Sequence, residues 1–512
     1  MNPVNTISIT RNWKRSLVIF IGLLLAGPAI VRAEGWPHYA GHSTRNAVAM
    51  EAPPQLSAIL WLADQDLLGN PIEFEGPSSP VVHDGRVFVN AKHIENNLHT
   101  KNKMVALDAM TGQWLWETIV DKPLFEFWSA PAVDLLNNAV LLGTGANLYS
   151  IDAMTGTPNW TAPLDRSIVN SSPVIPPDLN PGRAFVTDYD GFGTSASLYC
   201  VNTSPFNAMD NPYQPGDIVW QEPIGGSSGN SPAFHDGVIY VASSRGLSDS
   251  NGQIYAFDID AAPADRLLWQ WSLPTAEGFF GGVVHHNGFV YAASYNFNGS
   301  GENSTLVKIR ASDGTEQWTI PCERTNTMPV INGNKIYLAA GVQGFGSVPK
   351  VQAFEDQIHS ALKLWDTFVD TGGTLIIGGW THQPILDGNV LYIGKIPPNP
   401  LSFDAYTDLF LLDVTRSPAD PEFVIDHLAG MGSSPAASDG RLYTVGPGGL
   451  YAIAARGDFC ADGLVNGNDI ACFLDALLSG TPSESEIELG DFDEDGVLTT
   501  MDMPGFIDQM LE

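Results

Sequence analysis

The sequence of 512 residues carries a formal net charge of −33, from 24 basic and 57 acidic side chains. A surface of this sign repels nucleic acid and anionic membranes and attracts divalent cations. Four cysteines are too few for a disulfide-built scaffold in a chain of this length, whereas the apolar content is ample for a large core.

Residues 1–33 have the pattern of a secretory signal peptide. Three basic residues precede an apolar stretch over residues 17–26, and a small-x-small cleavage site ends at Ala33. The apolar stretch is shorter than the ~20 residues that span a bilayer, so cleavage is favoured over a membrane anchor. No cysteine stands at the cleavage site to carry a lipid. We therefore expect a secreted, extracellular or cell-envelope protein with no membrane span in the mature chain.

The stretch from Ser78 to Glu117 contains four short runs rich in β-branched residues, separated by a His-Asp-Gly turn, a polar loop and a Met-Thr-Gly turn. Such turns are typical of hairpins because Gly takes a positive φ at no steric cost, so we interpret the unit as four antiparallel strands. The small residues and Pro that open it mark the start of its first strand. Equivalent starts lie at Ser78, Ser129, Ser171, Asn230, Gly281, Thr327, His382 and Ser433. Recurrence at roughly 40–50 residues predicts a propeller with one blade for each start.

The outer strand of most units carries a tryptophan, which we expect to wedge between neighbouring sheets. These residues are Trp116, Trp160, Trp220, Trp269, Trp318 and Trp365, with Phe423 in the seventh unit. The eighth unit stops after its third strand, residues 450–453, and a run that fits the missing outer strand occurs at Ile59-Leu60-Trp61-Leu62. We therefore predict that the N-terminal segment pairs into the last blade and closes the ring.

The Leu-Asp-Ala-Met-Thr-Gly-x-x-x-Trp spacing at residues 107–116 resembles the PQQ-like (quinoprotein) β-propeller repeat, and residues 35–41 resemble the entry segment of its secreted bacterial members. The resemblance covers about residues 35–455. It implies an all-β, eight-bladed β-propeller, four antiparallel strands per blade, over residues 34–456. The superfamily contains quinoprotein dehydrogenases and a non-catalytic lipoprotein, BamB, that helps to assemble outer-membrane barrels.

The resemblance does not extend to the redox centre. Quinoprotein dehydrogenases that resemble this propeller hold an adjacent Cys-Cys pair under the quinone, and this chain has neither that pair nor a Cys-x-x-Cys-His haem motif. Both absences argue against PQQ as a cofactor and against redox catalysis. Cys200 and Cys322 belong to different blades, so we expect no bridge between them.

The residues just before each innermost strand should ring the mouth of the central channel, and in some blades they are large or charged. They are Phe127, Trp128, Phe279, Phe280, Glu323, Arg324, Trp380 and His382. Aromatic rings with a few polar groups can form a ligand platform. They can equally fill the channel as a plug, and the sequence leaves both readings open.

The composition changes at Gly457, because residues 457–512 contain no Lys, Arg or His and many acids. A first set of oxygen ligands has the spacing of an EF-hand calcium loop, with Asp in place of Glu at its last position. The set consists of Asp491, Asp493, Asp495, the carbonyl of Val497, Thr499 and Asp502, with Gly496 at the turn.

A second copy of this loop lies upstream. Its ligands are Asp458, Asp462, the carbonyl of Leu464, Asn466 and Asp469, with Cys460 at the third position. A thiol is a poor ligand for a hard cation, so we expect the upstream loop to bind more weakly. Cys460 can instead bridge to Cys472, and that bridge and a free thiol are both open.

Each loop leads into an amphipathic helix. The apolar residues are Ile470, Phe473, Leu474, Leu477 and Leu478 in the first helix, and Met503, Phe506, Ile507, Met510 and Leu511 in the second. Two loop–helix repeats with Asp at the last loop position resemble a dockerin type I domain over residues 457–512. That resemblance implies bound calcium and a cohesin-like protein partner.

These observations favour a secreted, non-catalytic propeller scaffold for protein or ligand recognition with a calcium-dependent docking tail. The alternative is an enzyme. It would be a dockerin-borne, polysaccharide-active enzyme of polysaccharide catabolism, which the dockerin resemblance supports, or a PQQ-dependent oxidoreductase, which the missing cysteines oppose.

Overall fold

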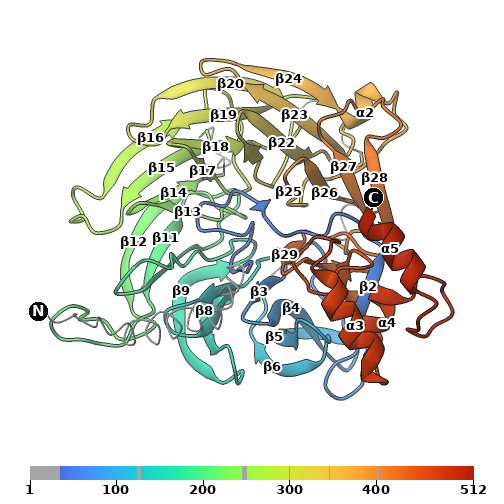
Figure 1. Ribbon diagram of the computed structural model, residues 1–512. Helices are drawn as coiled ribbons and strands as arrows, with labels where there is room; N and C mark the ends of the chain where they lie inside the picture. The colour runs from blue at the N-terminus through green and yellow to red at the C-terminus, as the bar shows by residue number, and fades with distance from the viewer. Residues whose placement is uncertain are drawn as a thin grey trace, which may run out of the picture. The chain divides into compact units, whose positions relative to one another are not determined.

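The strand-forming repeats fold into sheets arranged as a ring in the computed structural model of the protein (Figure 1). The structure describes residues 35–123, 128–244, 251–298, 300–344, 346–397, 399 and 403–511. Within those residues there are eight sheets, one for each predicted repeat. The predicted eight-bladed β-propeller is therefore confirmed. The predicted signal peptide, residues 1–33, lies outside the described residues.

Each blade is an antiparallel meander that runs from the centre of the ring outward. The first blade is β3 (Val81–His83), β4 (Arg86–Glu95), β5 (Leu98–Asp108) and β6 (Trp114–Val120), the second β7 (Ala132–Asp134), β8 (Ala139–Asp152) and β9 (Pro158–Ile168), and the third β10 (Arg183–Thr187), β11 (Ala196–Asn202) and β12 (Ile218–Gly225). The fourth is β13 (Ala233–His235), β14 (Val238–Ala242), β15 (Gln253–Asp258) and β16 (Leu267–Ser272), and the fifth β17 (Val284–His286), β18 (Phe289–Ala293), β19 (Ser304–Arg310) and β20 (Glu316–Cys322). The sixth is β21 (Val330–Asn332), β22 (Lys335–Ala340), β23 (Lys350–Asp356) and β24 (Ala361–Asp366), followed by the one-turn helix α2 (Thr367–Asp370). The seventh is β25 (Ile385–Asp387), β26 (Val390–Lys395), β27 (Asp408–Asp413) and β28 (Val424–Ala429), and the eighth β29 (Ala436–Ser438), β30 (Arg441–Gly446), β31 (Gly449–Ala454) and β2 (Ala58–Ala63).

Two blades reach the four-strand plan with fewer separate strands. In the second blade, the beginning of β8 pairs with β7 and its end pairs with β9, so one strand takes both middle places. In the third blade the innermost strand is reduced to a single bridge between Val174 and Phe185. The blade count read from the repeats is unaffected, because each blade keeps its outer pair.

The ring is closed by the N-terminal segment. β2 pairs antiparallel with β31, with Leu62 opposite Tyr451 and Ala63 opposite Leu450, and it forms the outer strand of the eighth sheet. The displaced outer strand predicted from the Ile59–Leu62 run is confirmed. Closure in this way covers the sheet edge that β31 would otherwise expose.

The outer-strand tryptophans hold successive blades together. Trp116 Nε1–H donates to the carbonyl of Ala153 in the next blade at 3.1 Å, and Trp61 makes the same bond to Ala109 across the closure. Both of these indoles pack on the glycine of the neighbouring Thr-Gly turn, Trp61 on Gly112 and Trp116 on Gly156. A Cβ at Gly156 would lie 2.7 Å from the Trp116 ring, so the turn requires Gly both for its φ of +71° and for this contact.

Residues 36–51 pass through the centre of the ring and touch the blades in order, as the blue trace in Figure 1 shows. In seven blades this segment bonds to the middle of the innermost strand or its equivalent, at Val82, Val133, Ile175, Phe234, His285, Ile331 and Leu386. In the eighth blade, Gly440 N–H donates to the carbonyl of Glu51. The segment also adds β1 (Val48–Ala49) in parallel to β25. It therefore ties every blade to one continuous strap.

Arg45 is the buried anchor of this strap. Its side chain is fully buried, and its guanidinium donates to the carbonyls of Tyr39, Ser172, Pro173 and Pro232 at 2.7–2.9 Å. Guanidinium presents donors in a rigid fork, which suits several carbonyls at once. Burial lowers the pKa of Arg45 to about 9, and the group remains charged at neutral pH.

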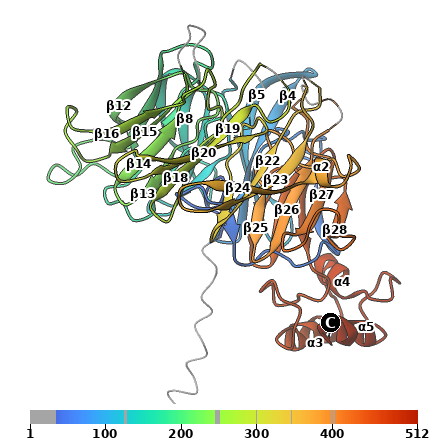
Figure 2. The same ribbon diagram turned by 90° about the horizontal axis from the view of Figure 1, so that it is seen from above.

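The acidic tail forms three short helices with a separate small core (Figure 2). They are α3 (Asp469–Ser479), α4 (Glu484–Gly490) and α5 (Met503–Leu511). Phe473 and Phe506 stack in the core at a centroid distance of 4.3 Å. No helix among the described residues is long and apolar enough to cross a bilayer.

Helix α4 joins the tail to the propeller. The sequence analysis did not predict it. Its N-terminus has a capping box between Ser483 and Glu486, a signal that is visible in the sequence. Leu489 is buried within the core of the propeller, and Ser485 Oγ–H donates to the carbonyl of Leu60 on β2 at 3.4 Å. The tail therefore rests on the strand that closes the ring.

Candidate functional site

The downstream loop brings three carboxylates together. Oxygen atoms of Asp491, Asp493 and Asp502 lie within 4.8 Å of one another. Asp491 accepts hydrogen bonds from the backbone of Asp495 and Gly496, at 3.0 and 2.8 Å, which curls the loop around its first ligand. A turn of this shape points the remaining oxygens toward one place and leaves them for a cation.

The last carboxylate of this loop folds back over the turn. Asp502 accepts from the backbone of Phe492 and Asp493 with Oδ1, and from Thr499 with Oδ2 at 2.8 Å. Asp495 accepts a hydrogen bond from the backbone N–H of Val497 at 3.0 Å. Three of the four predicted carboxylate ligands therefore lie together, and Asp495 is not part of that group.

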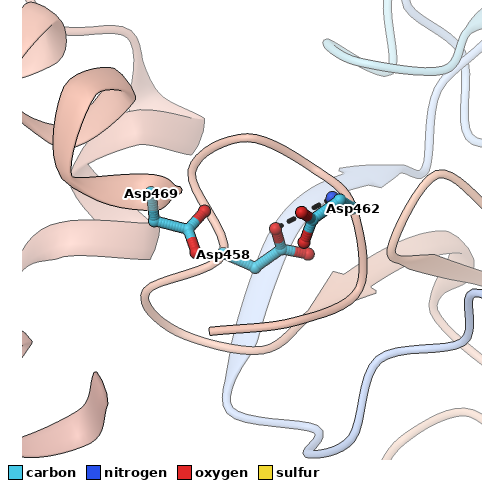
Figure 3. Close-up of side chains that lie close together, drawn as sticks. All are labelled: Asp458, Asp462 and Asp469. Atoms are coloured by element: carbon cyan, nitrogen blue, oxygen red, sulfur yellow. Dashed lines mark hydrogen bonds between the residues drawn. The ribbon is translucent and has the colours of Figure 1, made fainter. Parts of the chain in front are cut away.

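The upstream loop repeats most of this pattern, and Figure 3 shows its three acidic side chains close together. Asp458 accepts from the backbone of Asp462 and Gly463, and Asp469 accepts from the backbone of Cys460 and Asn466. Oxygens of Asp458, Asp462 and Asp469 lie within 4.8 Å of one another, with Asp458 and Asp469 buried. Leu464 follows Asp462 as Val497 follows Asp495, with its N–H bonded to the Asp462 carboxylate. Because the same hydrogen-bond pattern occurs twice, it supports a ligand-binding turn more strongly than a single acidic cluster would.

Electrostatics favour a cation at both loops. Burial, together with the charges of Asp469 and Asp462, raises the pKa of Asp458 to about 7. Desolvation and the neighbouring carboxylates also raise the pKa of Asp493. Negative groups that repel one another at this distance are stabilised when a divalent ion neutralises them.

The two loops differ at their third position. Cys460 forms a disulfide with Cys472, with a Cα–Cα distance of 5.8 Å, so its sulfur is not available to a metal. The sequence left the bridge and a free thiol open, and the structure has the bridge. The upstream loop therefore has no counterpart to the Asp493 side chain of the downstream loop. Cys200 and Cys322 are free and buried, as predicted for two thiols in different blades. Disulfides are typical of proteins outside the cytoplasm.

A second candidate site is a cavity of about 380 Å³ where the innermost strands begin. Trp128, Phe280, Arg324 and Trp380 line it, as predicted from their place before those strands. The cavity shows that these side chains do not fill the channel completely. The strap of residues 36–51 lies farther along the same strands and occupies the centre there.

The other predicted mouth residues lie elsewhere. Phe279 belongs to the hydrophobic core, and Glu323 and His382 are fully buried beside the channel without lining the cavity. In an extended segment neighbouring side chains point to opposite sides, so Phe279 and Glu323 turn away where Phe280 and Arg324 turn in. His382 accepts from the backbone of Gly394, and burial lowers its pKa to about 3. Phe127 lies outside the described residues.

Sequence reasoning missed five of the eight aromatic residues of the wall. Its remaining rings come from the loops between the second and third strands of three blades. They are Tyr189, Phe192, Tyr295, Phe297 and Phe403. The available signal was an aromatic residue in these loops, which the corresponding loops of the first, second, fourth and eighth repeats lack.

Comparison with known proteins identifies the propeller. The family model described as "Outer membrane protein assembly factor BamB" matches residues 70–261 and 250–396, which together are more than half of the chain. The chain belongs to this family. The matched residues run from the first blade into the seventh and include neither the eighth blade nor the tail.

The relatives are distant. The BamB protein of Moranella endobia (strain PCIT) is 22% identical over 250 residues, which cover 46% of this chain and 54% of the relative. The chain therefore spans about half the length of the curated relative that it matches. Two solved structures share the fold. The quinohemoprotein alcohol dehydrogenase of Comamonas testosteroni has a TM-score of 0.54 at 13% identity, with 83% of this chain and 81% of that chain covered. A europium-containing methanol dehydrogenase has a TM-score of 0.55 at 9% identity, with 80% and 89% covered.

Proposed function

We propose that this BamB-like protein is a non-catalytic recognition scaffold outside the cytoplasm, whose tail, residues 457–512, is a dockerin-like module that binds calcium and docks to a cohesin-like partner. The observation that carries the proposal is the repeated turn around Asp458 and Asp491, with matching hydrogen bonds in both copies. Calcium suits these loops because it takes six to eight oxygen ligands in a flexible geometry.

The tail also offers a surface for a partner. Three apolar residues spaced four apart on α3 are exposed, namely Ile470, Leu474 and Leu478. On α5, Ile507 and Leu511 are exposed with the same spacing. Residues four apart share one helix face, and exposed apolar stripes of this kind support protein docking. The sequence assigned these residues to the faces that carry Phe473 and Phe506. The two phenylalanines enter the small core, and Leu477, Met503 and Met510 pack against it.

The first test is calorimetric titration of the full chain with calcium. We expect two ions per chain for the natural protein, and one for the Asp491→Ala and Asp458→Ala variants taken singly. A stoichiometry of zero, or one that neither variant changes, would reject the metal module.

The second test measures binding of the full chain to a panel of purified cohesin modules, in calcium and in chelator. Binding should require calcium and should be lost in Leu478→Glu, whose side chain is 78% exposed. The matched control is Leu362→Glu on the outer strand of the sixth blade, which is 49% exposed and far from the tail in sequence. If no module binds in calcium, the docking role is wrong even when the ions bind.

A further inference from the structure

The central cavity is walled by aromatic rings that touch one another. Trp128 packs on Phe403 at a centroid distance of 5.1 Å, Trp380 on Tyr295 at 5.6 Å, and Phe280 on Phe297 at 5.1 Å. Phe297 is nevertheless 54% exposed. An apolar wall with exposed rings at its rim gains free energy when the flat face of a ligand covers it.

The charge next to the cavity is paired. Among the residues that the structure describes, Arg324 is the one charged residue that lines the cavity, and its Nε lies 3.7 Å from Glu323 Oε1. Behind that pair, Lys350 Nζ lies 3.5 Å from Glu323 Oε2 and 3.6 Å from Asp366 Oδ2. Lys363 also pairs with Asp366 and with Glu302, so three cations face three carboxylates. No carboxylate is among the described residues that line the cavity. A charged ligand would have to be desolvated without a free counter-charge, which disfavours it.

Two buried polar atoms belong to residues of the cavity wall and have no hydrogen-bond partner among the described residues. They are the donor Trp380 Nε1 and the acceptor Asn326 Oδ1. The two residues are neighbours, because Asn326 N–H donates to the carbonyl of Trp380 at 2.8 Å. A hydroxyl group is both donor and acceptor, so it can satisfy an N–H and an amide oxygen. Buried polar atoms that stay unpaired are unfavourable, so a ligand group that pairs with them gains affinity.

We propose that this cavity binds an uncharged aromatic compound of two or three rings that carries a hydroxyl group. The rings would lie against the aromatic wall, and the hydroxyl would face Trp380 Nε1 and Asn326 Oδ1. The inference rests on the proposed role of the propeller as a recognition scaffold, but it does not depend on the tail.

A sugar ring is a poorer match for this wall. Each of its several hydroxyls loses water on entry and needs a partner, and the wall beyond Asn326, Trp380 and Arg324 is mostly rings and aliphatic side chains. An aromatic carboxylate could stack on the rings, but its charge would not be compensated, because Arg324 is already paired with Glu323.

The test is a fluorescence titration of the full chain in chelator, so that the tail plays no part, with four probes. They are 2-naphthol, naphthalene, 2-naphthoate and methyl glucoside. We expect 2-naphthol to bind about tenfold more tightly than naphthalene, and to bind more tightly than the other two probes. In Asn326→Leu this preference for the hydroxyl should shrink to about twofold or less, whereas naphthalene should bind as well as before. Asn332→Leu, an exposed site in the same blade, is the matched control and should keep the full preference.

Several results would overturn the inference. They are equal binding of naphthol and naphthalene, tighter binding of the carboxylate or the sugar, or an unchanged preference in Asn326→Leu. Recovery of 2-naphthol is measured in the same samples. Chemical turnover of the bound probe would contradict the non-catalytic scaffold while leaving the site in place, and absence of binding would reject the site while leaving the calcium module to its own tests.

Discussion

Single residues of the two acidic loops should differ in their effect on calcium binding. Cys460 is held in a disulfide, so the upstream loop lacks the side-chain oxygen that Asp493 gives the downstream loop. Fewer charged ligands generally mean weaker calcium binding. We predict that Asp491→Ala or Asp502→Ala removes the tighter of the two sites and that Asp458→Ala removes the weaker one.

Calorimetry of the full chain resolves this prediction, because the two sites titrate separately when their dissociation constants differ. The controls are the natural protein and Asp475→Ala, which removes an acidic residue of α3 outside both loops. If Asp458→Ala abolishes the tighter site, the ranking of the loops is reversed.

His38 should make the propeller sensitive to acid. Burial, and secondarily the charge of Arg45, lowers the pKa of His38 to about 3, against 6.5 for an ordinary histidine. The folded state therefore resists a proton that the unfolded state takes up below pH 6.5, and stability falls as the pH drops from 6.5 toward 3. At pH 4.5 the loss from this residue alone is about 2–3 kcal/mol.

The measurement is urea unfolding at pH 7 and pH 4.5 for the natural protein and His38→Gln. The variant should be less stable at pH 7, because its contact with Ile175 changes, but it should lose less stability on acidification. His359→Gln, at an exposed position, is the control and should behave like the natural protein. Equal acid losses in the natural protein and His38→Gln would contradict the assignment.

At the scale of elements, the strap and β2 hold the ring closed. Deleting residues 34–63 should expose the edge of β31 and the surface on which the Trp61 ring packs. That ring is only 9% exposed in the intact chain. We expect aggregation and a large loss of stability, because an uncovered sheet edge pairs with other chains.

The milder variant Trp61→Ala should stay soluble and lose about 3–5 kcal/mol of unfolding free energy, because a buried ring and its bond to Ala109 are both removed. Leu62→Ala on the same strand is the control, since Leu62 is 44% exposed. Light scattering and thermal melting check both changes. A deleted chain that remains monomeric with an unchanged melting temperature is incompatible with closure by β2.

At the scale of the whole molecule, the shared fold does not bring the activity of the quinoprotein dehydrogenases. The sequence has no adjacent cysteines, and the free thiols of Cys200 and Cys322 are buried in different blades. We predict that PQQ with calcium produces no saturable absorbance change and no alcohol- or sugar-dependent dye reduction. Stoichiometric binding with turnover would make the protein an oxidoreductase.

The blade count, the ring closure and the acidic turns are all properties of local sequence. Gly and Asp at turns, Pro at strand starts and Trp on outer strands impose the same hairpin geometry wherever they recur, so the repeats alone predict eight blades. The Ile59–Leu62 run was recognisable because one unit lacked an outer strand. Asp491 and Asp502 were recognisable because an EF-hand turn fixes its ligands by spacing within a dozen residues.

Only the tertiary structure decided what fills the channel. Residues 36–51 have no periodicity of their own, because successive parts of the segment bond to different blades. Their path is set by contacts with residues far away in the sequence. The docking of α4 on β2 is likewise a long-range contact. The aromatic wall draws Phe192, Phe297 and Phe403 from loops of three blades, and closure of the ring is what brings those loops to one cavity.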